Sequence, residues 1–228
     1  FGLNNGLEDA RNLGWKIAAR LKGWGTDKLL ASYSEERHPI FKETGENFIA
    51  ARIEKESKFF ETYNPDEDLE AFLVAWEQKK EGTARLVTTY EPNYEGSSVI
   101  DGPVDGVSSA HGEHSFKARA GHHLAPLTLS SGKNVFEELG NDFNLLALDD
   151  EMKVAEAFEK AANELNVPLK IIHDTCADDR EDYKARYILI RPDHYIVWSG
   201  DNEPKDVVQL LEKAVGKCQH LSGMHEIK

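Results

Sequence analysis

The feature that most constrains the fold is a change in hydrophobic periodicity along the chain. Over the first 80 residues, apolar side chains recur at three- and four-residue steps, a spacing that predicts amphipathic helices. From Asn144 onward, short runs of apolar and β-branched residues are separated by turn signals and by one helical stretch. The sequence therefore predicts a helical first part followed by a separate α/β part.

The helical part is predicted to contain four helices. The first is bounded by Asn4-Asn5-Gly6 at its start and by Lys22-Gly23 at its end, both common at helix termini. The second is expected to end before Pro39, because proline disfavours helical backbone in the residue that precedes it. The expected ranges are residues 7–21, 26–37, 41–60 and 68–80.

The α/β part is predicted to follow the order β-α-β-β-β-α. Its last two strands are joined by Arg191-Pro192-Asp193, a tight turn that predicts a hairpin. A β-α-β unit followed by a hairpin and a closing helix is the order of the thioredoxin fold. The expected strands are residues 144–148, 168–172, 185–190 and 194–198, and the expected helices are residues 154–165 and 204–217.

The connection between the two parts is predicted to be mostly irregular. Residues 64–123 carry repeated turn signals, and Gly106–Gly121 has the composition of an exposed loop. We therefore expect a helical domain over residues 1–95, a linker over 96–120, a second domain over 121–220 and a tail over 221–228. The helical segment is expected to be loosely attached, so limited proteolysis should cut first between residues 95 and 120.

Charge and composition exclude several classes of protein. The sequence has 27 Lys and Arg against 41 Asp and Glu, a formal net charge of −14, and such a surface repels nucleic-acid phosphate and anionic lipid. No run of about 18 apolar residues is present to span a bilayer. We therefore expect neither a nucleic-acid nor a membrane partner.

The cysteines and the first residue bear on the compartment. Cys176 and Cys218 form neither a disulfide framework nor a C-x-x-C motif, which favours a cytoplasmic location. Because the chain opens at Phe1 rather than at Met, we expect that an upstream region, with any targeting segment, is missing.

The first six residues are the candidate binding feature. Phe1–Gly6 contains two glycines and two asparagines and runs into the predicted N-terminus of a helix. Unpaired backbone N–H groups and the positive end of the helix dipole attract an anion or an electron-rich oxygen there. The alternative is a glycine-containing turn capped by asparagine. These residues alone leave both interpretations open.

Three segments resemble motifs of one enzyme family. Gly2–Ala18 is similar to the G-x-N-x-G-x-x-D-A-x-N-L-x-W-K-L-A segment of the class A flavoprotein monooxygenases, the aromatic hydroxylases related to phenol and p-hydroxybenzoate hydroxylase. Leu30–Pro39 resembles their L-x-x-Y-x-x-E-R-x-P segment, and Leu189–Trp198 resembles the L-V-R-P-D-x-Y-V-A-W hairpin of their thioredoxin-like C-terminal domain. Residues 40–110 match only in general character, and Gly121–Leu127 lacks the Pro-His that often follows the domain-opening glycine.

The resemblance implies a fold and a cofactor. The chain would be an α/β protein in which a helical remnant of an FAD-binding domain precedes a thioredoxin-like domain. The cofactor-binding residues would be Gly2, Leu3, Asn4 and Asn5, lying against the pyrimidine edge of the isoalloxazine ring. Backbone N–H groups of Leu3 and Asn4 would meet the N1–C2=O edge, where negative charge collects when flavin is reduced. Gly2 and Gly6 would allow the ring to approach closely.

The resemblance also implies roles for residues further along the first helix. Asp9, Ala10 and Asn12 would orient the helix rather than touch the chemistry. Leu13 and Trp15 would lie in the core.

No complete catalytic site is expected in this chain, and no catalytic residue is assigned. A G-x-G-x-x-G after a strand is absent, as are the D-G and G-D segments that hold pyrophosphate and ribose in the family. The complete enzyme that the resemblance implies would use FAD, NAD(P)H and O₂ to hydroxylate a small phenolic or aromatic substrate. The chain alone is expected to be inactive and to bind FAD weakly or not at all. The alternative is a non-catalytic thioredoxin-like module for interaction or dimerisation, and a homodimer is possible.

Other polar clusters favour no metal or redox site. His111, His114, His122 and His123 are interpreted as part of a polar loop, because no helical spacing or carboxylate supports a metal. Asp149-Asp150-Glu151-Met152 stands where a redox-active thioredoxin would have C-x-x-C, which excludes disulfide exchange there. The acidic run Cys176–Asp182 is interpreted as a solvated loop, because it lacks the ligand spacing and the glycine of a calcium loop.

Overall fold

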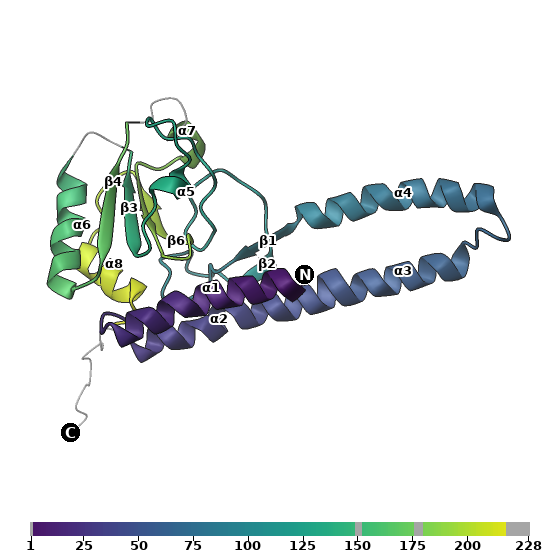
Figure 1. Cartoon of the computed structure of the whole chain (residues 1–228), viewed down its shortest axis with the longest axis horizontal. Helices are drawn as coiled ribbons and strands as arrows, with labels where there is room; N and C mark the ends of the chain where they lie inside the picture. The colour runs from purple at the N-terminus through teal and green to yellow at the C-terminus, as the bar shows by residue number, and fades with distance from the viewer. Residues whose placement is uncertain (1, 149–151, 176–179, 218–228) are drawn as a thin grey trace, which may run out of the picture.

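The computed structural model describes residues 2–148, 152–175 and 180–217, without the side chains of residues 81–87, 180 and 181. Figure 1 shows an α/β body, two helices that run along its base and two helices that project away from it as an arm. The helical first part and the α/β second part that the sequence predicts are therefore both present. The segments Asp149–Glu151, Cys176–Asp179 and Cys218 lie outside the described residues, so the interpretations given to them stay predictions.

The first helix starts earlier than expected. α1 spans Gly2–Leu21, so the predicted loop Gly2–Gly6 is wrong and forms the first turns of the helix. Glycine is a poor helix former, but Arg37 donates hydrogen bonds to the backbone and side-chain oxygens of Asn5. We infer that these tertiary contacts stabilise the turns against the low helix propensity of the glycines.

The second helix continues through the residue at which it was expected to stop. α2 spans Asp27–Glu43, and the Thr26 side chain caps its start by accepting a hydrogen bond from the Leu29 N–H. Pro39 lies inside α2, and the predicted end before it is wrong. Ile40, just beyond the proline, is fully buried, and its burial stabilises the continuation of the helix.

A π-helical stretch separates α2 from the arm. η1 spans Thr44–Ala50, and α3 follows directly over Ala51–Thr62. Phe48 of η1 is fully buried and packs its ring edge-on against Tyr90, with centroids 4.9 Å apart. The predicted third helix, residues 41–60, is thus divided among the end of α2, η1 and α3.

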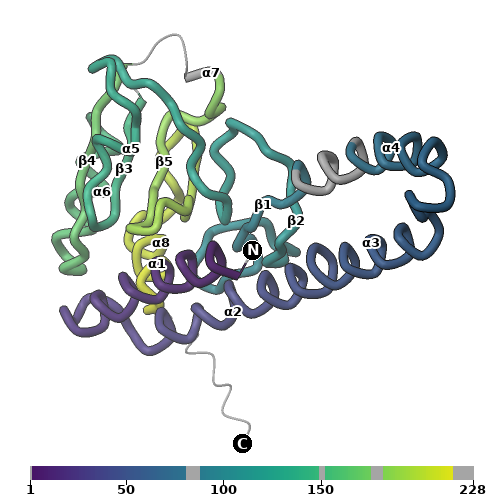
Figure 2. Tube along the Cα trace, turned by 45° about the vertical axis from the view of Figure 1, so that its right-hand side comes forward, coloured from purple at the N-terminus to yellow at the C-terminus, as the bar shows by residue number. Residues whose placement is uncertain are grey.

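The arm consists of α3 and α4, which spans Leu69–Thr88. The two helices run side by side away from the body (Figures 1 and 2). None of the residues of α3 is buried. Inside the arm the rings of Phe59, Phe72 and Trp76 pack together with centroids 5.7 to 5.8 Å apart; Phe72 and Trp76 are stacked, and Phe59 is inclined to both.

The body is built on a four-stranded mixed sheet. β3 pairs in parallel with β4, whereas β5 pairs antiparallel with both β3 and β6, which gives the order β4-β3-β5-β6. The predicted order of strands and helices is confirmed, and the short helix α7 (Arg180–Tyr183) is added between β4 and β5. The strands are β3 Phe143–Ala147, β4 Leu169–His173, β5 Tyr187–Ile190 and β6 Ile196–Gly200, and the helices are α6 Met152–Leu165 and α8 Val207–Ala214.

Each face of the sheet is covered by a different set of residues. Phe143 and Leu145 of β3 share an apolar cluster with α6, α8 and the helices α1 and α2. Leu146 and Ile188 face the other way, into a cluster with residues 124–139, which include the short helix α5 (Val135–Glu138). This alternation follows from the two-residue period of a strand.

The helices α1 and α2 are joined closely to the body. Trp15 and Trp24 both pack edge-on against Phe143 of β3, with ring centroids 5.8 and 5.9 Å apart. The predicted loose attachment is therefore wrong for α1 and α2, because their apolar residues and those of the sheet form one core. The domain limits at residues 95 and 120 stay a prediction.

The connection contains a ribbon that the sequence did not reveal. β1 (Tyr90–Asn93) pairs antiparallel with β2 (Ser109–His111), with an irregular register. Such short strands carry too few residues to show a two-residue period. Within the part of the chain described, no helix is both long and apolar enough to cross a bilayer.

Candidate functional site

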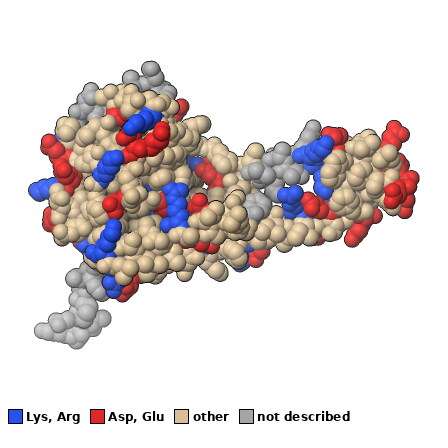
Figure 3. All heavy atoms as spheres, viewed as in Figure 1, with Lys and Arg blue, Asp and Glu red and all other residues tan. Residues whose placement is uncertain are grey.

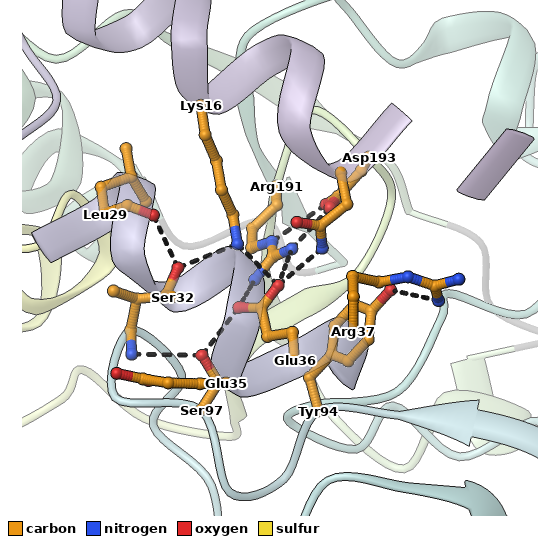
Figure 4. Close-up of polar contacts among 12 residues, drawn as sticks. Lys16, Leu29, Ser32, Glu35, Glu36, Arg37, Tyr94, Ser97, Arg191 and Asp193 are labelled. Atoms are coloured by element: carbon orange, nitrogen blue, oxygen red, sulfur yellow. Dashed lines mark hydrogen bonds and ion pairs between the residues drawn. The ribbon is translucent and has the colours of Figure 1, made fainter. Parts of the chain in front are cut away.

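A buried carboxylate joins the two parts of the molecule. Glu36 of α2 accepts hydrogen bonds from Lys16 of α1 at 2.7 Å and from Arg191 at 2.7 and 3.0 Å (Figure 4). The side chains of all three residues are fully buried. Asn12 and Ser97 donate two further hydrogen bonds to the same carboxylate, at 2.6 and 2.7 Å. Glu36 is therefore surrounded by donors from three separate segments of the chain, because Asn12 and Lys16 both lie on α1.

Arg191 lies at the centre of this network. It also pairs with Asp193, whose carboxylate accepts a hydrogen bond from the indole N–H of Trp15 at 3.0 Å. The guanidinium lies over the Trp15 ring, 5.1 Å from its centroid. The turn that was predicted only as a hairpin connection is thus the point at which the body binds α1 and α2.

The electrostatics of the network keep its charges balanced. Burial would raise the pKa of Glu36, but the charges of Arg191 and Lys16 and their hydrogen bonds lower it to about 2. Burial lowers the pKa of Lys16 to about 8, although the neighbouring Glu36 acts in the opposite direction. Asp193 supplies a second negative charge, so two cations and two anions are buried together.

Arg37, the neighbour of Glu36, holds the first turns of α1. Its Nη2 donates to the Asn5 carbonyl at 3.2 Å, and its Nε donates to Asp9 at 2.6 Å. The hydroxyl of Tyr90 on β1 donates to the Asn5 side-chain oxygen at 3.2 Å. The Asp9 position therefore orients the helix, as expected, through Arg37.

A pocket of about 670 Å³ opens beside these first turns. Its apolar walls include Leu7, Pro92 and Phe116, and the buried Tyr195 also lines it. Glu91, His114 and His123 contribute polar groups to the lining. The lining comes from residues 4, 5, 7, 8, 90–92, 114–116, 123–126 and 195.

The four residues expected to bind the cofactor occupy different positions around the pocket. Asn4 and Asn5 line it, and Asn5 is buried, whereas Gly2 and Leu3 are exposed and outside the lining. The first four N–H groups of a helix have no partner within the helix, so this turn presents backbone donors. No atom lies within 4 Å of the position that a Cβ would take at Gly2 or Gly6. The turn thus has donors and open space, which fits the edge of a planar ring.

Two other positions differ from expectation. Among the four histidines interpreted as a polar loop, His122 is buried, and its ring nitrogens contact Glu91 at 3.0 Å and Glu95 at 2.9 Å. His122 lies in an irregular segment, as the loop interpretation expects, but its side chain is buried, and the interpretation is wrong for His111, which lies in β2. Among the described residues, no group of three His, Cys, Asp or Glu is placed to hold a metal ion. Of the pair expected in the core, Trp15 is buried and Leu13 is half-buried.

Sequence reasoning missed the network and the pocket walls. Lys16 and Arg191 stand next to apolar residues, and charged residues in that setting are a signal that could have indicated buried ion pairs, whereas Glu36 stands among polar and charged neighbours and carries no such signal. The pocket walls come from segments up to 191 residues apart, Asn4 and Tyr195. A pattern of neighbouring residues in the sequence cannot indicate a pocket whose lining comes from such distant segments.

Comparison with known proteins gives two family matches. A model described as FAD binding domain matches residues 1–47, and a model described as aromatic-ring hydroxylase, C-terminal, matches residues 117–218. All three sequence motifs lie within these ranges.

Individual relatives agree with the family matches. The tetracenomycin A2 monooxygenase-dioxygenase of Streptomyces glaucescens is 29% identical over 232 residues, which cover 94% of this chain and 38% of that protein. The FAD-dependent monooxygenase opdD of Penicillium oxalicum is 26% identical over 89% of this chain and 42% of that protein. The structure of the rebeccamycin biosynthetic enzyme RebC with reduced flavin superposes with a TM-score of 0.76 at 26% identity, over 96% of this chain and 42% of that one. The chain thus spans about two fifths of the length of these relatives.

Proposed function

Because this chain belongs to the FAD-dependent aromatic-ring hydroxylases, we propose that it forms one wall of a monooxygenase site that hydroxylates a phenolic or other aromatic substrate. The observation that carries the proposal is the position of the first turn of α1 at the edge of the pocket. The chain alone would be inactive, because the pyrophosphate-binding motifs of the family are absent from it.

The residues of this chain would bind and orient the cofactor. When bound, FAD supplies the redox and oxygen-activating chemistry, with NAD(P)H as the hydride donor. The backbone N–H groups of Leu3 and Asn4 would donate to the pyrimidine edge of the flavin and stabilise negative charge there. Arg37 and Tyr90 would keep that turn in place through Asn5.

The pocket supplies a place for part of the aromatic substrate. Leu7, Pro92 and Phe116 offer apolar contact to a ring, whereas Glu91 and His123 could accept or donate a hydrogen bond at a phenolic hydroxyl. A protein of similar fold, aklavinone-11 hydroxylase, was obtained in a ternary complex with FAD and aklavinone.

We further propose that residues 121–220 form a thioredoxin-like domain without redox activity, preceded by residues 1–95 of an FAD-binding domain and a linker over 96–120. The parallel β3–β4 pair, the β5–β6 hairpin and the helices α6 and α8 support this assignment. A role as a non-catalytic interaction module is the second candidate, and the exposed apolar side chains on the arm favour it.

The test is a fusion in which this chain replaces the matching part of the tetracenomycin A2 monooxygenase-dioxygenase. We expect the purified fusion to retain FAD and to oxidise NAD(P)H faster when a phenolic ligand is added. Gly2→Val should lower FAD retention, because a β-branched side chain would hold the ring off. Ala31→Val, at an exposed position of α2, is the matched control and should have no effect on FAD.

A titration of the 228-residue chain with FAD completes the test. Flavin fluorescence should show no saturable binding at micromolar concentration, because a few hydrogen bonds of about 0.5–1.5 kcal/mol each do not offset the entropy of immobilising a free ligand. Tight binding would show that the chain holds a complete site. A folded fusion without FAD would favour the interaction module.

A further inference from the structure

The pocket beside the first turns of α1 has an uneven distribution of charge. The described residues that line it include two glutamates, Glu8 and Glu91, but no lysine or arginine. His123 also lines the pocket, and burial lowers its pKa, so this imidazole adds no positive charge at neutral pH. Glu8 lies close enough to His123 for its charge to oppose that shift. An anion in the pocket would therefore face two carboxylates without a lysine or arginine in the lining to offset them.

Contacts on one side hold Glu91 at the pocket wall. Its Oε1 accepts a hydrogen bond from Nη2 of Arg119 at 2.8 Å and lies 3.0 Å from Nδ1 of His122. The Glu91 side chain is only 16% exposed. Its other oxygen, Oε2, is buried and has no hydrogen-bond partner among the described residues. One oxygen of the carboxylate is thus held by the protein, whereas the other retains the capacity to accept a hydrogen bond.

The cations near the pocket lie outside its lining and have other partners or contact solvent. Arg119 donates to the Glu113 carbonyl as well as to Glu91. Arg37 is paired with Asp9. Arg11 is exposed, so water and salt screen its charge. A ligand carboxylate would have to displace an existing partner to pair with Arg119 or Arg37.

We propose that Glu8 and Glu91 make this pocket selective for uncharged aromatic ligands that carry a hydroxyl, and against aromatic carboxylates. A phenolic O–H can donate to a carboxylate, which only accepts hydrogen bonds. A ligand carboxylate would instead bring a like charge into a partly buried site, and such repulsion is a common source of specificity. Leu7 and Phe116 offer apolar contact to the ring in either case. This inference rests on the proposed function and narrows its substrate class.

The experiment titrates the ¹⁵N-labelled 228-residue chain at neutral pH with two probes, methyl p-hydroxybenzoate and p-hydroxybenzoate. The probes share the ring and the hydroxyl, and only the second carries a carboxylate. We expect the ester to shift the amide signals of Phe116 and Leu124, which line the pocket, with a Kd in the millimolar range. The acid should bind at least about tenfold more weakly. Equal affinities, or no shift of these signals with either probe, overturn the inference.

Two variants test the carboxylates themselves. Glu8→Gln and Glu91→Gln each remove one negative charge from the lining and keep the size of the side chain. Each should narrow the difference in affinity between the probes at least about threefold, because the acid meets less like charge. Glu61→Gln, exposed on the arm, removes the same charge and is the matched control, in which the ratio should stay unchanged.

The ratio of the two affinities separates a change of charge from a general defect. A loosened pocket would weaken both probes alike, whereas the loss of a carboxylate changes their ratio. An unchanged ratio in either folded variant overturns the inference. Glu8→Gln keeps the test decisive if Glu91→Gln, which leaves Arg119 without its carboxylate partner, does not fold.

The selectivity of the pocket and the flavin assignment can fail separately. Selective binding of the ester by the chain, together with a folded fusion that retains no FAD, would uphold the selectivity and count against the proposed monooxygenase site. A fusion that retains FAD, but whose NAD(P)H oxidation is stimulated equally by the acid and the ester, would overturn the selectivity and leave the proposed function intact.

Discussion

The base of the molecule and its arm use charge in opposite ways. At the base, Glu36 and Arg191 are fully buried and join segments 155 residues apart. On the arm, the ion pairs Arg52–Glu56, Lys58–Glu54 and Lys80–Glu77 are exposed and link residues three or four apart on one helix. The buried Glu36–Arg191 pair determines how distant parts of the chain are assembled. Each exposed pair of the arm supports only the helix on which it lies.

The two regions also differ in what surrounds their apolar side chains. Trp15, Trp24 and Phe143 form part of the common core. The aromatic residues of the arm pack mainly on one another, and acidic side chains from residues 61–70 gather at its far end (Figure 3). The arm is therefore stabilised mainly by contacts within itself, whereas α1 and α2 share the core of the body.

The largest expected effect is at Glu36. Glu36→Ala would leave the charges of Lys16 and Arg191 buried with one carboxylate too few, and we expect the free energy of unfolding to fall by about 3–5 kcal/mol. Urea unfolding followed by tryptophan fluorescence measures the change. A loss below about 1 kcal/mol would mean that the network does not hold α1 and α2 to the body.

The pH dependence of the free energy of unfolding tests the buried charges at the base of the molecule further. The pKa of Glu36 is lowered from 4.5 to about 2 in the folded protein. A lowered carboxyl pKa stabilises the fold above the unfolded value, and this stabilisation, on the order of 3 kcal/mol, is lost as pH falls from about 4.5 toward 2. Glu36→Gln should therefore flatten the decline of unfolding free energy between about pH 5 and 3. Identical slopes in the two proteins would contradict the assignment.

A smaller and local effect is expected at Trp76. Its ring packs on Phe59 and Phe72 and lies 4.9 Å from the Lys79 ammonium. Trp76→Ala should lower the local stability of the arm by about 1 kcal/mol and speed proteolytic cleavage near residues 63–68 about fivefold. The unfolding midpoint of the body should stay unchanged, and a shift in it would show that the arm and the body unfold together.

The order of proteolytic cuts also separates the arm from the body. The sequence predicts a first cut between residues 95 and 120, but the end of the arm is a second candidate site. Asp101 and Ala118 donate backbone hydrogen bonds to Val197 and Tyr183 of the body. Residues 61–68, in contrast, are exposed throughout. We therefore expect the arm to be cut first, and mass spectrometry of the early fragments identifies the site.

The smallest effect is expected at the exposed pair of Glu54 and Lys58. Glu54→Ala, the counterpart of Glu36→Ala, should leave the unfolding midpoint of the body within experimental error, because solvent screens an exposed pair. The same urea titration provides the comparison. If the two alanine variants were equally destabilised, the contrast between base and arm would be wrong.

Prediction from sequence succeeded where the signals are local. The turn Arg191-Pro192-Asp193 and the alternation around it were enough to place the β5–β6 hairpin. It failed at Gly2–Gly6 and at Pro39, where local propensity favours a break but contacts of Asn5 and Ile40 stabilise a helix. These contacts involve partners distant in sequence, which no window of neighbouring residues contains.

In the candidate site too, the sequence indicated some residues but not their contacts with distant segments. Asn4 and Asn5 were named through the family resemblance and line the pocket, and their contact with a cofactor stays a prediction. The role of Arg37 was not reached, although it lies inside a recognised motif, because a motif names residues without naming their contacts. His122 was assigned to a polar loop because the two carboxylates that surround it lie on another segment.

The π-helical stretch η1 makes the direction of the arm depend on a count of residues. Each residue of a helix turns the chain by a fixed angle, about 100° in an α-helix and less in a π-helix, so deleting one residue from Thr44–Ala50 would rotate α3 about its axis while α2 and α3 kept their own sequences. The rotation would carry the aromatic cluster of the arm to a different side of the molecule. A one-residue change in length at η1 is thus a means by which related chains could redirect this arm without altering any of its side chains.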